Sequence, residues 1–306
     1  MKPPLRTLTS LLCISFSLFT TAGCSGNGEP HDTSPDAKSL PVAEKVDLPL
    51  DTYMLDEFKI FQLSTLFNEL TLTCMKEHGN TTTVLPKPPV PGVSKHNERR
   101  YGITDGRLAS RLGYRTPKPT AETSSAERIT LSEDEEFTLT GGSTKPGEVG
   151  RGGKNKEGKT VPPGGCAGEA LKKLGYAPTA TPGNPVSVQS LDKESFAESL
   201  RTDRVRNVLE KWSACMRDAG YTYAAEAFSA SNDRRFAGAS VTKLEREVAT
   251  ADVRCKKSSR LTEVWQAEET RIQTSLIARH QKELQAVRKQ RDTTLATISK
   301  FPDPTS

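Results

Sequence analysis

Residues 240–300 read SVTKLEREVATADVRCKKSSRLTEVWQAEETRIQTSLIARHQKELQAVRKQRDTTLATISK and contain neither glycine nor proline. A single helix of about 55 residues would extend roughly 80 Å, whereas a break near Lys256–Leu261 would produce a helical hairpin. The stretch therefore predicts a mainly α-helical fold with a long C-terminal helix or helical hairpin. The apolar side chains that recur at helical spacing are Leu244, Val248, Ala251, Cys255, Leu261, Trp265, Ile272, Leu276, Leu284, Val287, Leu295 and Ile298.

Shorter helices are predicted upstream, because apolar residues recur at spacings of three and four and a glycine follows each segment as a C-terminal cap. A further helical turn is expected after Ser132, which forms a capping-box pattern with Glu135. Residues 115–128, 140–165 and 176–190 are rich in polar residues, glycine or proline and predict long irregular loops, with 140–165 expected to be mobile. The predicted helices cover residues 55–78, 103–112, 166–174 and 203–219.

Two of these helices end in similar sequences. ELTLTCMKEHG, residues 69–79, matches EKWSACMRDAG, residues 210–220, at the glutamate, the Cys-Met pair, the next basic and acidic residues and the glycine. A disulfide, a methionine that fills the core and a capping glycine explain the repeat structurally. We therefore expect a helical domain over residues 51–301, with similar halves at 51–178 and 191–301.

The N-terminus has the pattern of a secretory signal. Lys2 and Arg6 precede an apolar stretch of a dozen residues, which is too short to cross a bilayer core of roughly 30 Å. Small residues then lead to Cys24 in the order Thr-Thr-Ala-Gly-Cys, which resembles a bacterial lipobox, although Thr21 stands where an aliphatic residue is usual. The resemblance implies cleavage after residue 23 and acylation of Cys24.

The segment after Cys24 predicts a flexible tether. Residues 24–50 show no periodic apolar pattern, and a flexible coil of this length has a root-mean-square reach of roughly 25–30 Å. Two or three acyl chains would hold such a chain stably on a membrane. The sequence thus predicts a signal peptide over 1–23, a lipidated tether over 24–50, the folded domain, and a tail over 302–306, with localisation on the extracytoplasmic face of the cell membrane.

Four cysteines remain in the folded domain, namely Cys74, Cys166, Cys215 and Cys255. An even number of cysteines in an exported chain favours disulfides, and four cysteines allow three connectivities. We favour Cys74–Cys166 and Cys215–Cys255, because each pair then lies within one half. A metal site would need two closely spaced ligand pairs. Cys74 and His78 form one pair and no second pair is recognised, so no metal is expected.

Several of these motifs together resemble a protein family. They are the lipobox, the helix ending in Cys-Met-x-x-x-Gly, Tyr101-Gly102-Ile103, Gly164-Gly165-Cys166 before a short helix, and Ala251-Asp252-x-x-Cys255. The chain is similar in these features to uncharacterised secreted lipoproteins of actinobacteria, over most of residues 55–298. The resemblance implies an extracytoplasmic location and disulfide pairing, and it implies no known activity.

No motif predicts an enzyme, a nucleotide site or a cofactor. Gly153-Lys-Asn-Lys-Glu-Gly158-Lys159-Thr160 fits the P-loop pattern, but no apolar strand precedes it and Val161-Pro-Pro-Gly-Gly cannot continue it as a helix. None of the four histidines, His31, His78, His96 and His280, lies in a nucleophile motif, and the acidic run Glu133–Glu136 is typical of a helix start. The alternative is an extracytoplasmic hydrolase whose residues meet only in the fold.

The charge balance excludes a nucleic-acid footprint. Without residues 1–23 the chain has 41 basic and 38 acidic residues, a net charge of +3, and no clustered basic face of the kind that binds nucleic acid. Hydrophobic residues are only 34% of the chain, which argues against a polytopic membrane protein and favours a small core with long loops. We expect a binding or accessory component of the cell envelope, with an envelope protein or cell-wall polymer as partner. The residues expected to contact an anionic surface are Arg279, Lys282, Arg288, Lys289 and Arg291.

Overall fold

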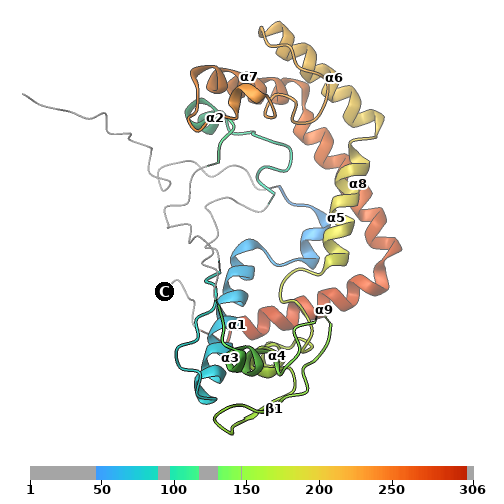
Figure 1. Cartoon of the computed structure of the whole chain (residues 1–306). Helices are drawn as coiled ribbons and strands as arrows, with labels where there is room; N and C mark the ends of the chain where they lie inside the picture. Colours follow the sequence, from blue (N-terminus) through green and yellow to red (C-terminus); the bar gives the residue numbers. More distant parts are fainter. Residues whose placement is uncertain (1–45, 89–96, 117–129, 146, 302–306) are drawn as a thin grey trace, which may run out of the picture. The chain divides into compact units, whose positions relative to one another are not determined.

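The computed structural model describes residues 46–88, 97–116, 130–145 and 147–301. Within those residues the fold is mainly helical, as predicted, with nine α-helices and one two-stranded hairpin (Figure 1). The helices are α1 (Glu57–Glu77), α2 (Gly106–Leu112), α3 (Glu133–Thr140), α4 (Gly165–Lys173), α5 (Val186–Ser199), α6 (Asp203–Asp218), α7 (Lys243–Ser259), α8 (Leu261–Arg279) and α9 (Gln281–Ile298). The remaining elements are the 3-10 helices η2 (Pro49–Tyr53) and η3 (Arg234–Phe236) and the strands β1 (Gly153–Lys154) and β2 (Thr160–Val161).

The helices begin at polar caps that satisfy backbone N–H groups at the open helix ends. Asp56 accepts from Lys59 N at the start of α1, and Asp105 accepts from Arg107 N and Leu108 N at the start of α2. The capping box expected between Ser132 and Glu135 is confirmed at the start of α3. Local sequence therefore determines where these three helices begin.

The long C-terminal stretch is divided into three helices. Arg260 separates α7 from α8 and adopts the left-handed conformation with φ +56°, which falls inside the expected break at Lys256–Leu261. A second break at His280, with φ −107° and ψ 21°, separates α8 from α9 and was not predicted. The C-terminal region is thus neither one continuous helix nor a hairpin of two helices, but three consecutive helices.

Packing crosses the boundary that the sequence suggested between the halves. In the first half, α2 packs against α7 and α1 packs against α9, and both partners belong to the second half. The largest buried cluster joins α6, α7 and α8 around Trp212 and Trp265 and includes Tyr101 from the first half. The two similar helix ends thus belong to one continuous network of helix contacts.

The folded part begins before residue 50, where the tether was expected to end. Leu48 is 4% exposed and Leu50 is fully buried. Leu50 packs with Ile272 and Leu276 of α8. Val46, Leu48 and Leu50 alternate with polar or turn residues over too few positions to show a period in the sequence. The prediction of a tether over residues 24–50 is therefore wrong for residues 46–50, which belong to the folded part. Residues 24–45 lie outside the described residues.

Two other loop predictions also need correction. Residues 153–161, expected to be part of a mobile loop, form the antiparallel hairpin of β1 and β2, with Gly153 paired to Val161 and Lys154 to Thr160. Residues 186–190, expected to be loop, begin α5, which packs against α8. Among the described residues, no helix combines the length and apolar character needed to cross a membrane.

Candidate functional site

The structure contains both disulfides that the sequence favoured. Cys74–Cys166 joins the last turns of α1 to the first turn of α4, and Cys215–Cys255 joins α6 to α7. Cys24, the expected lipidation site, lies outside the described residues. The surroundings of the two disulfides differ, and the first of them carries a set of polar side chains.

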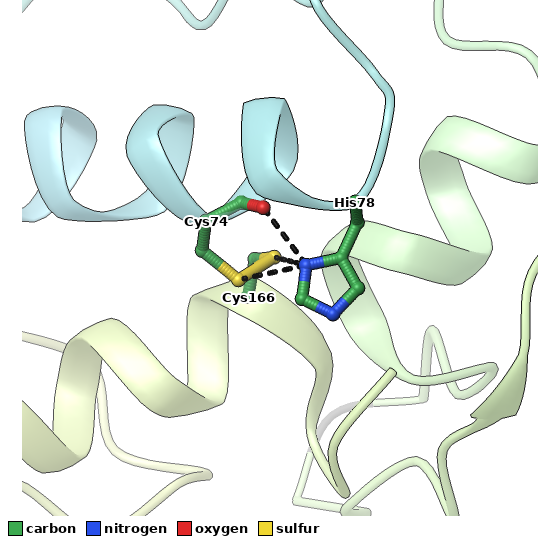
Figure 2. A group of neighbouring side chains, drawn as sticks. All are labelled: Cys74, His78 and Cys166. Carbon is green, nitrogen blue, oxygen red and sulfur yellow. Dashed lines mark hydrogen bonds between the residues drawn. A yellow bond between two sulfur atoms is a disulfide. The ribbon is translucent and has the colours of Figure 1, made fainter. Parts of the chain in front are cut away.

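His78 lies directly beside the Cys74–Cys166 disulfide. It caps the C-terminus of α1, and its Nδ1 is 3.7 Å from Cys74 Sγ and 3.9 Å from Cys166 Sγ (Figure 2). The same Nδ1 is 2.9 Å from the carbonyl oxygen of Cys74, and Nε2 is 2.9 Å from the carbonyl oxygen of Thr160 on β2. The ring thus connects the end of α1 to the hairpin and covers the sulfur atoms.

Glu169 completes this group from α4. Its Oε2 is 3.8 Å from Cys74 Sγ, and its Oε1 accepts an ion pair from Lys173 Nζ at 2.8 Å. Cys166 and Glu169 are three residues apart, one turn of α4, as Cys74 and His78 are one turn apart on α1. The sequence signal for this arrangement, which was not singled out in the sequence, is a carboxylate one helical turn after a cysteine, Glu169 after Cys166.

The second disulfide has simpler neighbours. Cys215 Sγ is 3.5 Å from the hydroxyl of Ser258, and Cys255 is fully buried in the cluster around Trp212 and Trp265. Because its neighbours differ, the Cys215–Cys255 disulfide can serve as a control in experiments on the Cys74–Cys166 disulfide.

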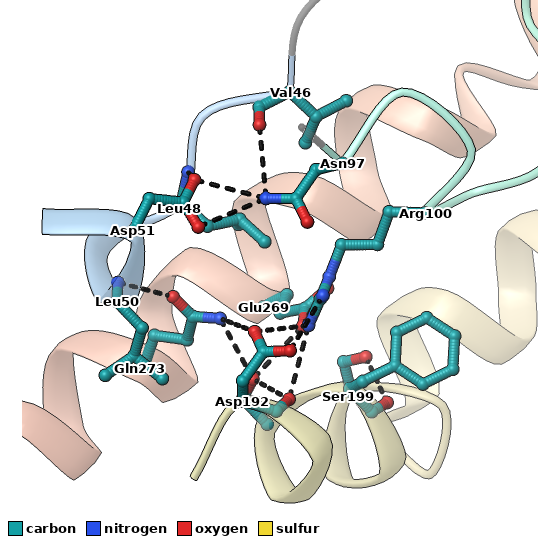
Figure 3. A network of polar contacts seen from close by, with 12 residues as sticks. Val46, Leu48, Leu50, Asp51, Asn97, Arg100, Asp192, Ser199, Glu269 and Gln273 are labelled. Atoms are coloured by element: carbon teal, nitrogen blue, oxygen red, sulfur yellow. Dashed lines mark hydrogen bonds and ion pairs between the residues drawn. The ribbon is translucent and has the colours of Figure 1, made fainter. Parts of the chain in front are cut away.

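A buried polar network connects four segments of the chain. Glu269 of α8 is fully buried, and both of its carboxylate oxygens lie 3.1 Å from Arg100 Nε (Figure 3). The Tyr101 hydroxyl donates to Glu269 at 2.9 Å, and the Ser195 hydroxyl of α5 donates to it at 3.1 Å. Arg100 also pairs with Asp192 of α5 at 2.8 Å.

The network continues to the N-terminal end of the described chain. Gln273 of α8 donates to the Ser195 hydroxyl at 3.0 Å and accepts from the backbone N–H of Leu50 at 2.9 Å. Burial alone would lower the pKa of Arg100, but its hydrogen bonds and ion pairs with Glu269 and Asp192 outweigh burial and raise that pKa. One guanidinium thus pairs with two carboxylates, and Tyr101, Ser195 and Gln273 donate further hydrogen bonds to these acids, so the network braces η2, α5 and α8.

A small pocket beside the main core is lined by side chains that bond to one another. Its lining includes the aromatic rings of Tyr101, Trp212 and Phe228. Asp252 accepts from Trp212 Nε1 at 2.8 Å and pairs with Lys256 Nζ at 3.0 Å. Phe228 has φ +63°, an uncommon conformation for a bulky residue. These side chains satisfy one another and fix the loop that carries Phe228 against the core.

The P-loop-like sequence does not form a P-loop. Its eight residues make the hairpin of β1 and β2 and the turn between them, and α4 begins five residues after Thr160. Lys159, which would face phosphate in a P-loop, donates to the carbonyl oxygen of Glu77 at 2.7 Å. The segment therefore forms a hairpin that is held against the end of α1.

Four of the five basic residues that were expected to contact an anionic surface are exposed. Arg279, Lys282, Arg288 and Lys289 are exposed at the end of α8 and along α9. Arg291 is half-buried, donates to the carbonyl oxygen of Met54 at 2.9 Å and pairs with Asp292, so it holds the N-terminal segment against α9. We define the four exposed residues as the α9 basic surface.

The remaining histidines do not join these groups within the described chain. His280 sits at the break between α8 and α9, half-exposed, with Nδ1 3.6 Å from Glu283. His31 and His96 lie outside the described residues. Comparison of the chain with protein-family models, with curated proteins and with solved structures finds no match. The geometry of the chain itself is thus the basis for functional inference.

Proposed function

We propose that this chain is a lipid-anchored lipoprotein of the extracytoplasmic membrane face that acts as a binding or accessory component of the envelope. The observation that carries the proposal is the N-terminal order of basic residues, a short apolar stretch, small residues and Cys24. The resemblance to secreted actinobacterial lipoproteins supports it. So does the presence of two disulfides, since such bonds persist mainly in oxidising, extracytoplasmic compartments.

Replacing Cys24 is expected to abolish lipid attachment. In a bacterial host fed a labelled fatty acid, Cys24→Ala should eliminate the label from the chain and shift it from the membrane to the soluble fraction. Cys13→Ala is the matched control, because Cys13 lies within the stretch that cleavage removes. The anchor proposal fails if Cys24→Ala keeps the label, or if Cys13→Ala loses it equally.

The α9 basic surface suggests where an anchored domain would meet its surroundings. η2 packs against α8 and α9, and Arg288 lies over the ring of Tyr53 with 5.8 Å to the ring centre. The N-terminal end of the described chain is therefore held against the helix that carries the basic residues. An anchor reached through this end would keep these cations near anionic headgroups, where each contributes about 1 kcal/mol.

Neutralising the α9 basic surface is expected to weaken binding to anionic vesicles. For the chain without its lipid, the triple variant Arg279→Ser, Lys282→Ser and Lys289→Ser should lose about 3 kcal/mol at low salt, which is roughly a 100-fold lower partition coefficient. Sedimentation with phosphatidylglycerol vesicles measures this, and neutral vesicles should show no difference. The exposed residues Lys193, Lys211 and Lys257 provide a matched control triple. An equal loss in the control triple would contradict a specific surface.

A further inference from the structure

The side chains around the first disulfide have the composition and spacing of a metal site. Two sulfur atoms, one imidazole nitrogen and one carboxylate oxygen approach one another from two helices. Cys74 and the C-cap His78 belong to the end of α1, and Cys166 and Glu169 lie on α4. The donor atoms of Cys74, His78 and Cys166 all lie within 4.8 Å of one another. Cysteine, histidine and carboxylate are the ligands that zinc takes in proteins.

The distances match a tetrahedral zinc ion. With Zn–S near 2.3 Å and Zn–N or Zn–O near 2.0–2.1 Å, neighbouring ligand atoms lie roughly 3.3–3.8 Å apart. His78 Nδ1 is 3.7 Å and 3.9 Å from the two sulfurs, and Glu169 Oε2 is 3.8 Å from Cys74 Sγ. Three of the six spacings of a tetrahedral site are thus present while the sulfurs are bonded. To bind the ion, the two sulfurs must separate, His78 Nδ1 must leave the Cys74 carbonyl, and the Glu169 carboxylate must move toward the other donors, because only the atoms of Cys74, His78 and Cys166 already lie within 4.8 Å of one another.

We propose that reduction of the Cys74–Cys166 disulfide creates a site for one zinc ion, bound by Cys74 Sγ, Cys166 Sγ, His78 Nδ1 and the carboxylate of Glu169. A dithiol transfers two electrons and two protons to the disulfide, which yields two protein thiols and the oxidised dithiol. Zinc then binds the two thiolates and releases both protons. His78 Nδ1 exchanges its contact with the Cys74 carbonyl for the metal.

Two partners behind the ligands favour zinc binding once His78 Nδ1 has left the Cys74 carbonyl. A histidine that binds metal through one nitrogen usually donates its other N–H to a carbonyl or carboxylate, which leaves the first nitrogen with a free lone pair. The Thr160 carbonyl, 2.9 Å from His78 Nε2, fills this role. Lys173 pairs with Glu169 Oε1, so that Oε2 is the oxygen near the sulfur.

The ligand chemistry selects among metals. Two thiolates and an imidazole favour zinc over the hard cations magnesium and calcium, which take oxygen ligands. The ion would connect α1 to α4 at the point where the disulfide connects them. The chain therefore keeps the same link between these helices in two forms, covalent when oxidised and metal-bound when reduced.

The test compares oxidised and reduced protein directly. The chain is reduced without oxygen, the reductant is removed, and zinc is titrated against a chromophoric chelator. We expect one zinc ion per reduced chain and none per oxidised chain. Cobalt as a probe should give the absorption of a tetrahedral thiolate site. The variant Cys74→Ala/Cys166→Ala should lose binding, whereas Cys215→Ala/Cys255→Ala, which removes the other disulfide, should retain it.

Two single variants test the other ligands without touching a disulfide. His78→Ala and Glu169→Ala should each raise the zinc dissociation constant of the reduced chain at least tenfold, and Glu157→Ala, at an exposed acid of the neighbouring hairpin, should leave it unchanged. Circular dichroism follows the fold in parallel. A reduced chain that loses helicity and regains it with one zinc ion supports the site. The proposal is overturned if the reduced chain takes up no zinc, whether helical or not, or if Cys74→Ala/Cys166→Ala binds zinc as tightly as the unmodified chain.

Discussion

Replacing Arg100 with alanine is expected to lower the free energy of unfolding by about 3–5 kcal/mol, because it leaves the fully buried carboxylate of Glu269 without its counter-charge. Among the described residues, Arg100 is the only ion-pair partner of Glu269. Tyr101 and Ser195 would still donate hydrogen bonds to the carboxylate, but neither carries a positive charge. Breaking a buried pair from one side is far more costly than removing a surface pair.

The partner substitution is expected to cost less. In Glu269→Ala, Arg100 keeps its pair with Asp192 at 2.8 Å, and its side chain is 11% exposed, so part of its charge is still compensated. Replacing both residues with apolar ones, as in Arg100→Met/Glu269→Leu, removes both buried charges and should be less destabilising than the sum of the single changes. The asymmetry between the two single variants identifies Glu269 as the group that most needs its partner.

Denaturant unfolding with the disulfides intact measures these differences. Glu263→Gln is the matched control on the same helix, since Glu263 is exposed and pairs only with exposed Arg260 among the described residues; its effect should stay below about 1 kcal/mol. If Arg100→Ala costs no more than this control, the network is not a structural brace. If the double variant costs as much as the two single changes together, the two residues do not stabilise the fold as a pair.

Features encoded over a few residues were predictable from the sequence. The helix start at Ser132, the glycines that end the helices and the break near Arg260 depend on local chemistry that a short window displays. The disulfide pairing followed from the repeated Cys-Met-x-x-x-Gly helix ends, which marked Cys74 and Cys215 as equivalent positions. Periodicity and caps were thus sufficient to predict most of the helices, and the repeat was sufficient to predict both disulfides.

Features that depend on distant residues were not predictable. Arg100 and Glu269 are 169 positions apart, and each looks like an ordinary surface charge within its own segment. α5 was missed because its apolar stripe is short: among its larger apolar residues only Val188 and Leu191 are buried, while Val186 is 78% exposed. The approach of Glu169 to the Cys74–Cys166 disulfide depends on the packing of α4 against α1. Tertiary packing, which a single sequence does not display, decides all three.

Removing either disulfide is expected to destabilise the fold by an amount set mainly by the length of the loop it closes. The chain-entropy relation gives about 4.6 kcal/mol for Cys74–Cys166 and about 3.9 kcal/mol for Cys215–Cys255, since their sequence separations are 92 and 40. Denaturant unfolding of Cys74→Ala/Cys166→Ala and Cys215→Ala/Cys255→Ala measures both values. Ser258→Ala, which removes only the hydroxyl near Cys215, controls for local packing and should cost less than about 1 kcal/mol.

The chain without both disulfides is expected to be largely unfolded. The combined loss of about 8.5 kcal/mol is comparable to the whole stability of a typical domain, about 5–15 kcal/mol, and this chain is poor in apolar residues, at 34%. The two crosslinks lie in different clusters, one between α1 and α4 and the other between α6 and α7, so their effects should add. Far-ultraviolet circular dichroism of the quadruple variant should show most of its helical signal lost. A quadruple variant that keeps its helices and unfolds cooperatively would mean that helix packing alone stabilises the fold.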